Sequence, residues 1–174
     1  MSNKSNIILI GMPGSGKSTV GVVLAKELGY SFLDSDLLIQ QTTGKKLQEL
    51  LNEHGSDGFL ALEEEVNSQI DVDRTVIATG GSVIFGPRAM EHLATQGTII
   101  HLDLSPEALE ARLANLRTRG VVMKPGQTIA DLYHIRTPLY LKYAHKTIQT
   151  DGLKLEQVVE RLAAFCRDQE AQHG

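Results

Sequence analysis

The chain contains, close to its amino end, the stretch Ile7-Ile8-Leu9-Ile10-Gly11-Met12-Pro13-Gly14-Ser15-Gly16-Lys17-Ser18. Its first four residues are apolar and mostly β-branched, which is typical of a strand buried on both faces of a sheet. Glycine, proline and serine follow, and a helical pattern runs from Lys17 to Leu28, where Gly29 offers a C-terminal cap. The stretch therefore predicts a buried strand, a tight glycine turn and a helix, in that order.

The turn fits the pattern G-x-x-x-x-G-K-[ST], the phosphate-binding loop (P-loop) of many nucleotide-binding proteins. Its glycines let successive backbone N–H groups point at phosphate oxygens, and the following helix adds the positive end of its dipole. We expect Lys17 to reach the β- and γ-phosphates of ATP and Ser18 to offer its hydroxyl to Mg²⁺. The residues assigned to nucleotide binding are Gly11, Gly14, Ser15, Gly16, Lys17, Ser18 and Thr19.

The rest of the chain alternates strand patterns with helix patterns. The expected strands are 7–10, 31–33, 75–78, 98–102 and 147–149. The expected helices are 17–28, 45–54, 57–70, one opened by Pro87, one by Ser105-Pro106, one by Thr137-Pro138, and 154–168. This order predicts a single α/β domain over residues 1–174, a three-layer P-loop fold with a central parallel sheet of about five strands.

Two carboxylates follow the second expected strand. Asp34 and Asp36 stand two residues apart at its carboxyl end, so we expect both side chains to leave the same face. Ligands of open α/β sheets bind in the crevice at that edge. One carboxylate is suited to hold a metal ion and its water, and the other to accept a proton from an attacking hydroxyl. The alternative is a pair of solvated turn aspartates.

Composition limits the possible partners. The 174 residues carry a net charge of −4 and are 41% hydrophobic, which fits a packed domain and disfavours nucleic-acid binding. No apolar run is long enough for a membrane span, the amino end lacks a signal-peptide core, and the single cysteine, Cys166, has no internal disulfide partner. We expect a cytoplasmic monomer or weak homodimer that binds neither nucleic acid nor membrane.

The order of these motifs resembles that of the shikimate kinases, from Ile7 to about Asp151. The resemblance is carried by the P-loop, Asp34-Ser35-Asp36, Phe59 with Glu63 four residues later, Thr79-Gly80-Gly81, the region of Arg117 and Arg119, and Arg136-Thr137-Pro138-Leu139-Tyr140. It implies direct in-line transfer of the γ-phosphoryl group of ATP to a hydroxyl of a small metabolite. Shikimate is the first candidate acceptor, and a different small hydroxylated metabolite is the second.

The resemblance also implies roles for single residues. Asp34 matches the aspartate near the metal, beside Ser18, and Asp36 matches the one that binds and deprotonates the acceptor hydroxyl. Further acceptor contacts are implied for Gly80, Gly81 and Arg136. A lid is implied over about residues 117–127, with Arg119 as its catalytic arginine and Arg112 and Arg117 as candidates for nucleotide contact.

Three features depart from the family's pattern. The family places an arginine that binds the acceptor carboxylate directly after Phe59, where this chain has Leu60. The third glycine of the turn is Ser82, and the lid lacks the usual R-P-L-L. Leu60 lies outside the apolar helical stripe Phe59, Leu62, Val66 and Ile70, on a face that continues through Glu63, Glu64 and Asn67. We expect Leu60 to line the acceptor site; the alternative is an isolated surface leucine.

Two other functions fit parts of the sequence. A nucleoside monophosphate kinase also has a P-loop and a lid, but its anionic acceptor needs several arginines, and these are almost absent between Val20 and Asp73. A non-catalytic nucleotide-binding module is expected to lack Lys17 or one of the two aspartates, and all three are present.

Overall fold

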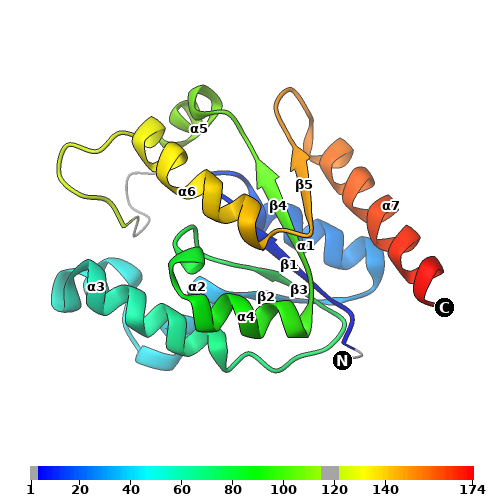
Figure 1. Ribbon diagram of the computed structural model, residues 1–174, viewed down its shortest axis with the longest axis horizontal. Helices are drawn as coiled ribbons and strands as arrows, with labels where there is room; N and C mark the ends of the chain where they lie inside the picture. The colour runs from blue at the N-terminus through cyan, green and yellow to red at the C-terminus, as the bar shows by residue number, and fades with distance from the viewer. Residues whose placement is uncertain (1–3, 115–121) are drawn as a thin grey trace.

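The computed structural model describes residues 4–114 and 122–174. Within these ranges, five parallel strands form one sheet in the order β2-β3-β1-β4-β5 (Figure 1). They are β1 (Asn6–Ile10), β2 (Ser31–Asp34), β3 (Thr75–Ala78), β4 (Gly97–Asp103) and β5 (Lys146–Gln149). The central strand β1 pairs with β3 on one side and β4 on the other, so Leu9 is in register with both Ala78 and Ile100. The expected α/β fold with a five-stranded parallel sheet is confirmed.

Helices cover both faces of the sheet, which explains why β1 is buried along its whole length and apolar from Ile7 to Ile10 (Figure 1). Ile7 and Leu9 pack into a cluster with α1 (Lys17–Leu28) and α7 (Leu155–His173). Ile8 and Ile10 point the other way and join the cluster that includes side chains of α4 (Pro87–Gln96), α5 (Pro106–Leu113) and α6 (Ile129–Tyr143). A third apolar cluster lies between α2 (Ser35–Thr43) and α3 (Leu47–Ser68).

The sequence patterns missed α2, which begins directly after β2. The carboxylate of Asp34 caps this helix by accepting hydrogen bonds from the amides of Asp36 (2.9 Å) and Leu37 (3.2 Å). Asp36 therefore lies in the first turn of a helix. The expectation that Asp34 and Asp36 leave one face of a strand is wrong, because the capping aspartate turns the chain before a second strand residue can follow.

Two other helix boundaries differ from the expected ones. Helix α6 begins at Ile129, and not at Thr137, because Thr128 and Asp131 form a capping box in which each side chain accepts the other's amide. Pro138 consequently lies inside α6. Helix α3 spans both expected helices of this region, with Gly55 in a left-handed conformation (φ 68°) at their junction.

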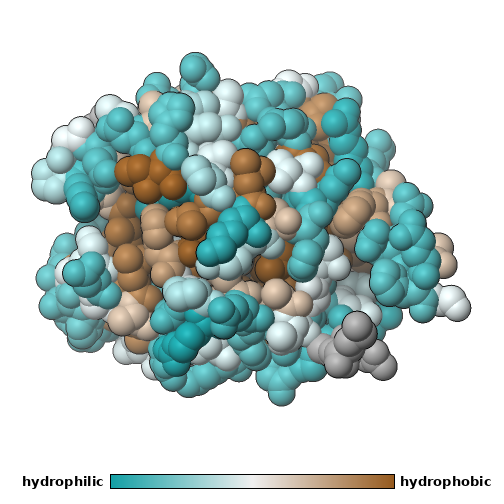
Figure 2. All heavy atoms as spheres, viewed as in Figure 1, coloured by the Kyte–Doolittle hydropathy of each residue, from teal (hydrophilic) through white to brown (hydrophobic). Residues whose placement is uncertain are grey.

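The carboxyl ends of the strands gather the residues to which the sequence assigns function. The P-loop follows β1, Asp34 ends β2, and the turn Thr79–Ser82 follows β3. A short helix, η1 (Val83–Phe85), continues from that turn and packs between α3, α4 and α6. Figure 2 shows hydrophobic residues gathered near the middle of the face in view. Phe85, in η1, is 36% exposed. None of the described helices combines the length and the hydropathy that a membrane span requires.

Candidate active site

The P-loop folds tightly between β1 and α1. Gly16 precedes α1 in a left-handed conformation (φ 91°) that favours glycine. Gly11 passes so close to β4 that a Cβ atom on it would lie 2.6 Å from the carbonyl oxygen of Leu102. The amide of Ser15 donates to the carbonyl of Met12 at 3.1 Å, which closes the turn. The loop ends at the N-terminus of a 12-residue helix, where the backbone favours a bound anion.

Lys17 places a cation inside this loop. The residue is 7% exposed, and its ammonium group donates to the carbonyl oxygens of Gly11 (2.7 Å) and Met12 (2.9 Å). Ser18 follows on α1 and donates its hydroxyl to the carboxylate of Asp34 at 2.9 Å. A hydroxyl and a carboxylate side by side are the hard oxygen ligands that Mg²⁺ prefers. These residues therefore fit a Mg²⁺ ion beside bound phosphates.

A cavity of about 230 Å³ adjoins the loop. Its lining includes Ser15, Gly16, Thr19, Arg112, Thr150 and Leu153. Arg112 reaches it from α5 and donates to the carbonyl of Gly14 at 3.2 Å. The structure thus brings together every residue that the sequence assigned to nucleotide binding within the described ranges, and it adds the segment between β5 and α7 as a further wall.

Two carboxyl groups converge on Gly80, in the turn after β3. A Cβ atom at Gly80 would lie 2.7 Å from Asp36 Oδ1 and 2.7 Å from Glu63 Oε2, so a larger residue here would displace these carboxyl groups. Glu63, on α3, is 2% exposed and accepts a hydrogen bond of 2.6 Å from the hydroxyl of Ser82. Burial raises the pKa of Glu63 to about 7, because desolvation and the nearby Asp36 carboxylate outweigh the hydrogen bond from Ser82.

Helix α6 brings a buried arginine to the same turn. Arg136 is 1% exposed, and its Nη2 donates to the carbonyl of Val122 at 2.7 Å. Its guanidinium lies 5.4 Å from the ring centroid of Phe85, and its Nε has no hydrogen-bond partner in the part of the chain that the structure describes. One turn later, the hydroxyl of Tyr140 donates to the carbonyl of Gly81 at 2.6 Å. A buried guanidinium with an unpartnered donor is suited to bind an anionic group.

Leu60 lies on the helical face that the sequence patterns describe as polar. On this face Glu63 is 2% exposed and Asn67 is fully buried, so the face is directed into the protein. Leu60 itself is partly buried and belongs to none of the three apolar clusters. It stands one helical turn before Glu63, which places it near the acceptor side of the site.

The sequence reasoning missed Glu63 as a site residue, although it noted the spacing from Phe59. The sequence signal that could have pointed to Glu63 is Ser82, which replaces the third glycine of the turn. A buried carboxyl group needs a hydrogen-bond donor, and the hydroxyl of Ser82 supplies one. Arg117 and Arg119 lie outside the described residues, as does the first part of the expected lid, residues 117–121. Of residues 117–127, the structure describes 122–127, with a turn in which Gln127 donates its amide to Lys124.

A larger hollow, of about 740 Å³, lies at the opposite end of the sheet. It is lined by the start of β1, the start of β4 and the end of α7, including Asn6, Gly97 and Glu170. Parallel strands place their amino and carboxyl ends on opposite edges, so this hollow is remote from the P-loop. Although this hollow is larger than the cavity beside the P-loop, it is not the candidate active site, because the phosphate-binding and acceptor residues lie at the other edge of the sheet.

The fold and the site define a P-loop small-molecule kinase, with a phosphate-binding loop on one side and a carboxylate and a buried arginine on the other. Residues 13–167 match the family model described as shikimate kinase. The chain belongs to the shikimate kinase family.

Individual relatives agree with this family. The chain is similar to the shikimate kinase of Thiobacillus denitrificans, with 39% identity over 153 residues that cover 86% of this chain and 84% of that one. It is 38% identical to the shikimate kinase of Thermodesulfovibrio yellowstonii over 160 residues, covering 90% and 92% of the two chains. A solved structure of the Acinetobacter baumannii shikimate kinase in complex with shikimate superposes with a TM-score of 0.88 at 31% identity, covering 97% and 96%.

Membership of this family makes the chain an ATP-dependent phosphotransferase that acts on a hydroxyl of a small molecule. It favours this activity over the two other functions that fit parts of the sequence, a nucleoside monophosphate kinase and a non-catalytic nucleotide-binding module.

Proposed function

We propose that this kinase phosphorylates a hydroxyl of a small hydroxy acid, and that shikimate is an acceptor. The observation that carries the proposal is that Asp36 approaches the turn at Gly80 and Arg136 approaches it at Gly81. Asp36 offers a carboxylate to a hydroxyl, and the buried Arg136 offers an anionic group its Nε, which has no partner among the described residues. A hydroxy acid presents both groups. The Acinetobacter relative, whose structure contains shikimate, supports this choice.

The nucleotide is assigned to residues 11–19 and to the adjoining cavity. The loop and Lys17 hold the phosphates of ATP, and Arg112 and the segment after β5 hold the remainder of the nucleotide. Ser18 and Asp34 hold Mg²⁺, which neutralises negative charge on the β- and γ-phosphates when it is bound.

In phosphoryl transfer, each of these residues has a separate role. Asp36 orients the acceptor hydroxyl and takes its proton as the new oxygen–phosphorus bond forms and the bond between the γ-phosphorus and the β-phosphate oxygen breaks. Lys17 moves its hydrogen bonds from the loop carbonyls to the phosphate oxygens. Arg136 fixes the acceptor's anionic end by charge-assisted hydrogen bonds. For Arg119 we keep the role that the resemblance implies, stabilisation of charge. For the lid over 117–127 we keep the exclusion of water.

Among the described residues that we assign to the acceptor site, Arg136 is the single arginine and Leu60 is apolar. Leu60 cannot form a charge-assisted hydrogen bond, so the orientation of the acceptor's carboxylate depends on Arg136. We therefore propose that shikimate binds weakly, and that a different small hydroxylated metabolite is the second candidate acceptor. A cytoplasmic location and a monomeric or weakly dimeric state remain predictions of the sequence.

An assay of ADP release coupled to pyruvate kinase and lactate dehydrogenase tests the proposal. Purified protein is given ATP, Mg²⁺ and a panel of hydroxy acids and polyols that includes shikimate. The matched controls are Lys17→Met, which removes the loop cation, and Lys26→Met, which removes an exposed lysine from the last turn of α1. We expect acceptor-dependent ADP release with shikimate that Lys17→Met abolishes and Lys26→Met preserves. Release with a polyol but not with any hydroxy acid would overturn the acceptor class.

A further inference from the structure

Glu63 is a buried carboxyl group without an ion pair among the described residues. The only hydrogen bond to its carboxyl oxygens in the described ranges comes from Ser82, on Oε1, while Oε2 lies over Gly80 beside Asp36 Oδ1. One turn earlier on the same helical face, Leu60 brings no charge. A carboxyl group in such surroundings favours its neutral form, since burial shields it from solvent and no described cation forms an ion pair with it.

Charged groups on three elements face Glu63. Asp36 at the start of α2 is the nearest like charge, and it raises the pKa of Glu63. Arg136 on α6 and Lys17 at the start of α1 are positive, and they lower it. Tyr140 on α6 lies nearby, and burial raises the pKa of its hydroxyl, so it stays neutral. The acceptor side thus holds two carboxyl groups against the positive charge of Arg136, and one of the two can lose or keep its proton.

We propose that Glu63, oriented by Ser82, determines the charge selectivity of the acceptor site. With Glu63 neutral, the site favours an acceptor whose anionic group balances Arg136. With Glu63 ionised, its carboxylate supplies that balance, and the site favours an uncharged acceptor of the same shape. This inference rests on the proposed function of Asp36 and Arg136 as the two ends of the acceptor site.

The ionisation of Glu63 and the binding of an anionic acceptor are linked equilibria. If a bound anion makes ionisation of Glu63 less favourable by some factor, ionisation of Glu63 weakens anion binding by the same factor. A pKa of about 7 for Glu63 places this exchange in the neutral range. The pKa of Glu63 lies above its unfolded value, so the neutral form prevails below about pH 7 and the ionised form above it. Selectivity for an anionic acceptor is therefore greatest on the acid side.

The experiment compares shikimate with its methyl ester, which differs in charge and keeps the hydroxyls. Binding of each is measured by calorimetry in the presence of ADP and Mg²⁺, from about pH 6 to about pH 8.5, where the carboxylate of shikimate stays ionised. The quantity of interest is the Kd of the ester divided by the Kd of shikimate. Effects that both ligands share, including nucleotide binding, cancel in this ratio.

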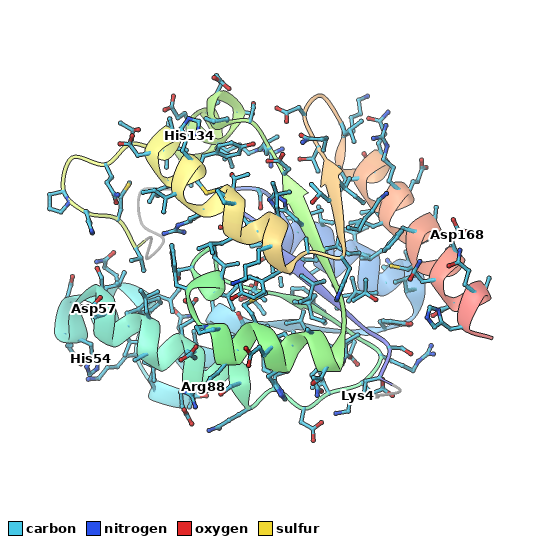
Figure 3. The ribbon with its side chains drawn as sticks, viewed as in Figure 1. Lys4, His54, Asp57, Arg88, His134 and Asp168 are labelled. Carbon is cyan, nitrogen blue, oxygen red and sulfur yellow. The ribbon has the colours of Figure 1, made fainter. Side chains whose placement is uncertain are left out.

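We expect the ratio to fall by about tenfold or more across this range in the wild-type protein, since one pKa unit of coupling corresponds to tenfold in affinity. In Glu63→Gln the ratio should not depend on pH. In Ser82→Ala the fall should move to higher pH, because the lost hydrogen bond stabilises the ionised carboxylate. Glu65→Gln is the matched control on the same helix, and it should behave as wild type. Glu65 is exposed and forms an ion pair with the exposed Arg88, which Figure 3 labels.

A merely structural role for Glu63 would weaken both ligands equally and leave the ratio flat in the wild type, which overturns the proposal. Failure of both ligands to bind overturns it as well. A pH-dependent ratio without any ADP release from shikimate supports the role of Glu63 and overturns only the proposed phosphorylation of shikimate. If Glu63→Gln does not fold by circular dichroism, the shift in Ser82→Ala decides the question.

Discussion

The hydroxyl of Tyr140 donates a hydrogen bond of 2.6 Å to the backbone carbonyl of Gly81. Tyr140 is fully buried, and its ring stacks on His101 of β4 at a centroid distance of 4.9 Å. Helix α6 is therefore fixed both to the turn after β3 and to the sheet. Because Arg136 lies one helical turn before Tyr140, this hydrogen bond helps to set the position of the buried guanidinium relative to the Gly80-Gly81 turn.

We predict that Tyr140→Phe destabilises the protein and weakens acceptor binding more than ATP binding. The substitution keeps the ring and leaves the Gly81 carbonyl without this donor, which costs about 1–3 kcal/mol for a buried group. Urea denaturation measures the stability, and the KM values for acceptor and ATP measure the binding. Tyr143→Phe, near the end of the same helix, is the control and should change neither. Equal increases in both KM values would argue that Tyr140 acts only on general stability.

Asp36→Asn and Asp34→Asn should have different kinetic effects. Asparagine at 36 removes the proton acceptor, so we expect kcat to fall by about 10²- to 10⁴-fold with little change in nucleotide affinity. Asparagine at 34 still caps α2, so the fold should remain intact, while the Mg²⁺ concentration needed for half-maximal activity rises. Steady-state kinetics with varied acceptor, ATP and Mg²⁺ separate the two effects. Small and equal losses of activity from both substitutions would indicate that Asp34 and Asp36 are surface carboxylates without a catalytic role.

Leu60→Arg should lower the KM for shikimate by at least about tenfold. A charge-assisted hydrogen bond to a carboxylate contributes about 1.5–3 kcal/mol, and Leu60 stands one turn before the buried Glu63 on an inward-facing helix face. Leu51→Arg, at another partly buried leucine of α3 beyond the kink at Gly55, is a control for the added charge alone. Efficient shikimate turnover by the wild-type protein, or no gain in Leu60→Arg, would show that Leu60 does not limit acceptor binding.

His101 gives the protein a pH-dependent stability. Burial lowers the pKa of this imidazole to about 4, against an ordinary value of 6.5. The unfolded chain therefore binds a proton that the folded chain does not, and stability contributed by neutral His101 is lost as the pH falls from about 6.5 towards 4. The loss is at most of the order of 3 kcal/mol. In proton NMR, the His101 ring signals should not shift between about pH 8 and pH 5, and titration above pH 6 would contradict this.

Elements defined by strong local patterns were predictable from the sequence. The strand 7–10, the helix 17–28 with its Gly29 cap, and Pro106 in the first turn of α5 all occur as expected. The failure to predict α2 and the displaced start of α6 have one cause. In both cases a capping side chain, Asp34 or Thr128, begins the helix before its apolar periodicity is visible.

The P-loop could be predicted because its residues, 11–19, are neighbours in the sequence, whereas the wall between β5 and α7 could not. The acceptor side could be predicted only in part, because its geometry depends on contacts between distant segments. Ser82 and Glu63 are 19 residues apart, and Tyr140 and Gly81 are 59 apart. The burial of Glu63 follows from how α3 packs against η1 and α4, which periodicity along α3 does not reveal.

Because Arg136 is buried, ligands that bind its guanidinium should raise the melting temperature of this protein. The guanidinium of Arg136 is 1% exposed, and within residues 4–114 and 122–174 its Nε has no partner, which lowers the stability of the folded chain because that donor is solvated in the unfolded one. A ligand that occupies the donor removes this penalty from the folded chain alone. Mass action then adds about 2.7 kcal/mol of stability at a ligand concentration 100 times its Kd. Thermal-shift screening of metabolites can therefore rank acceptors for this enzyme before any turnover is measured.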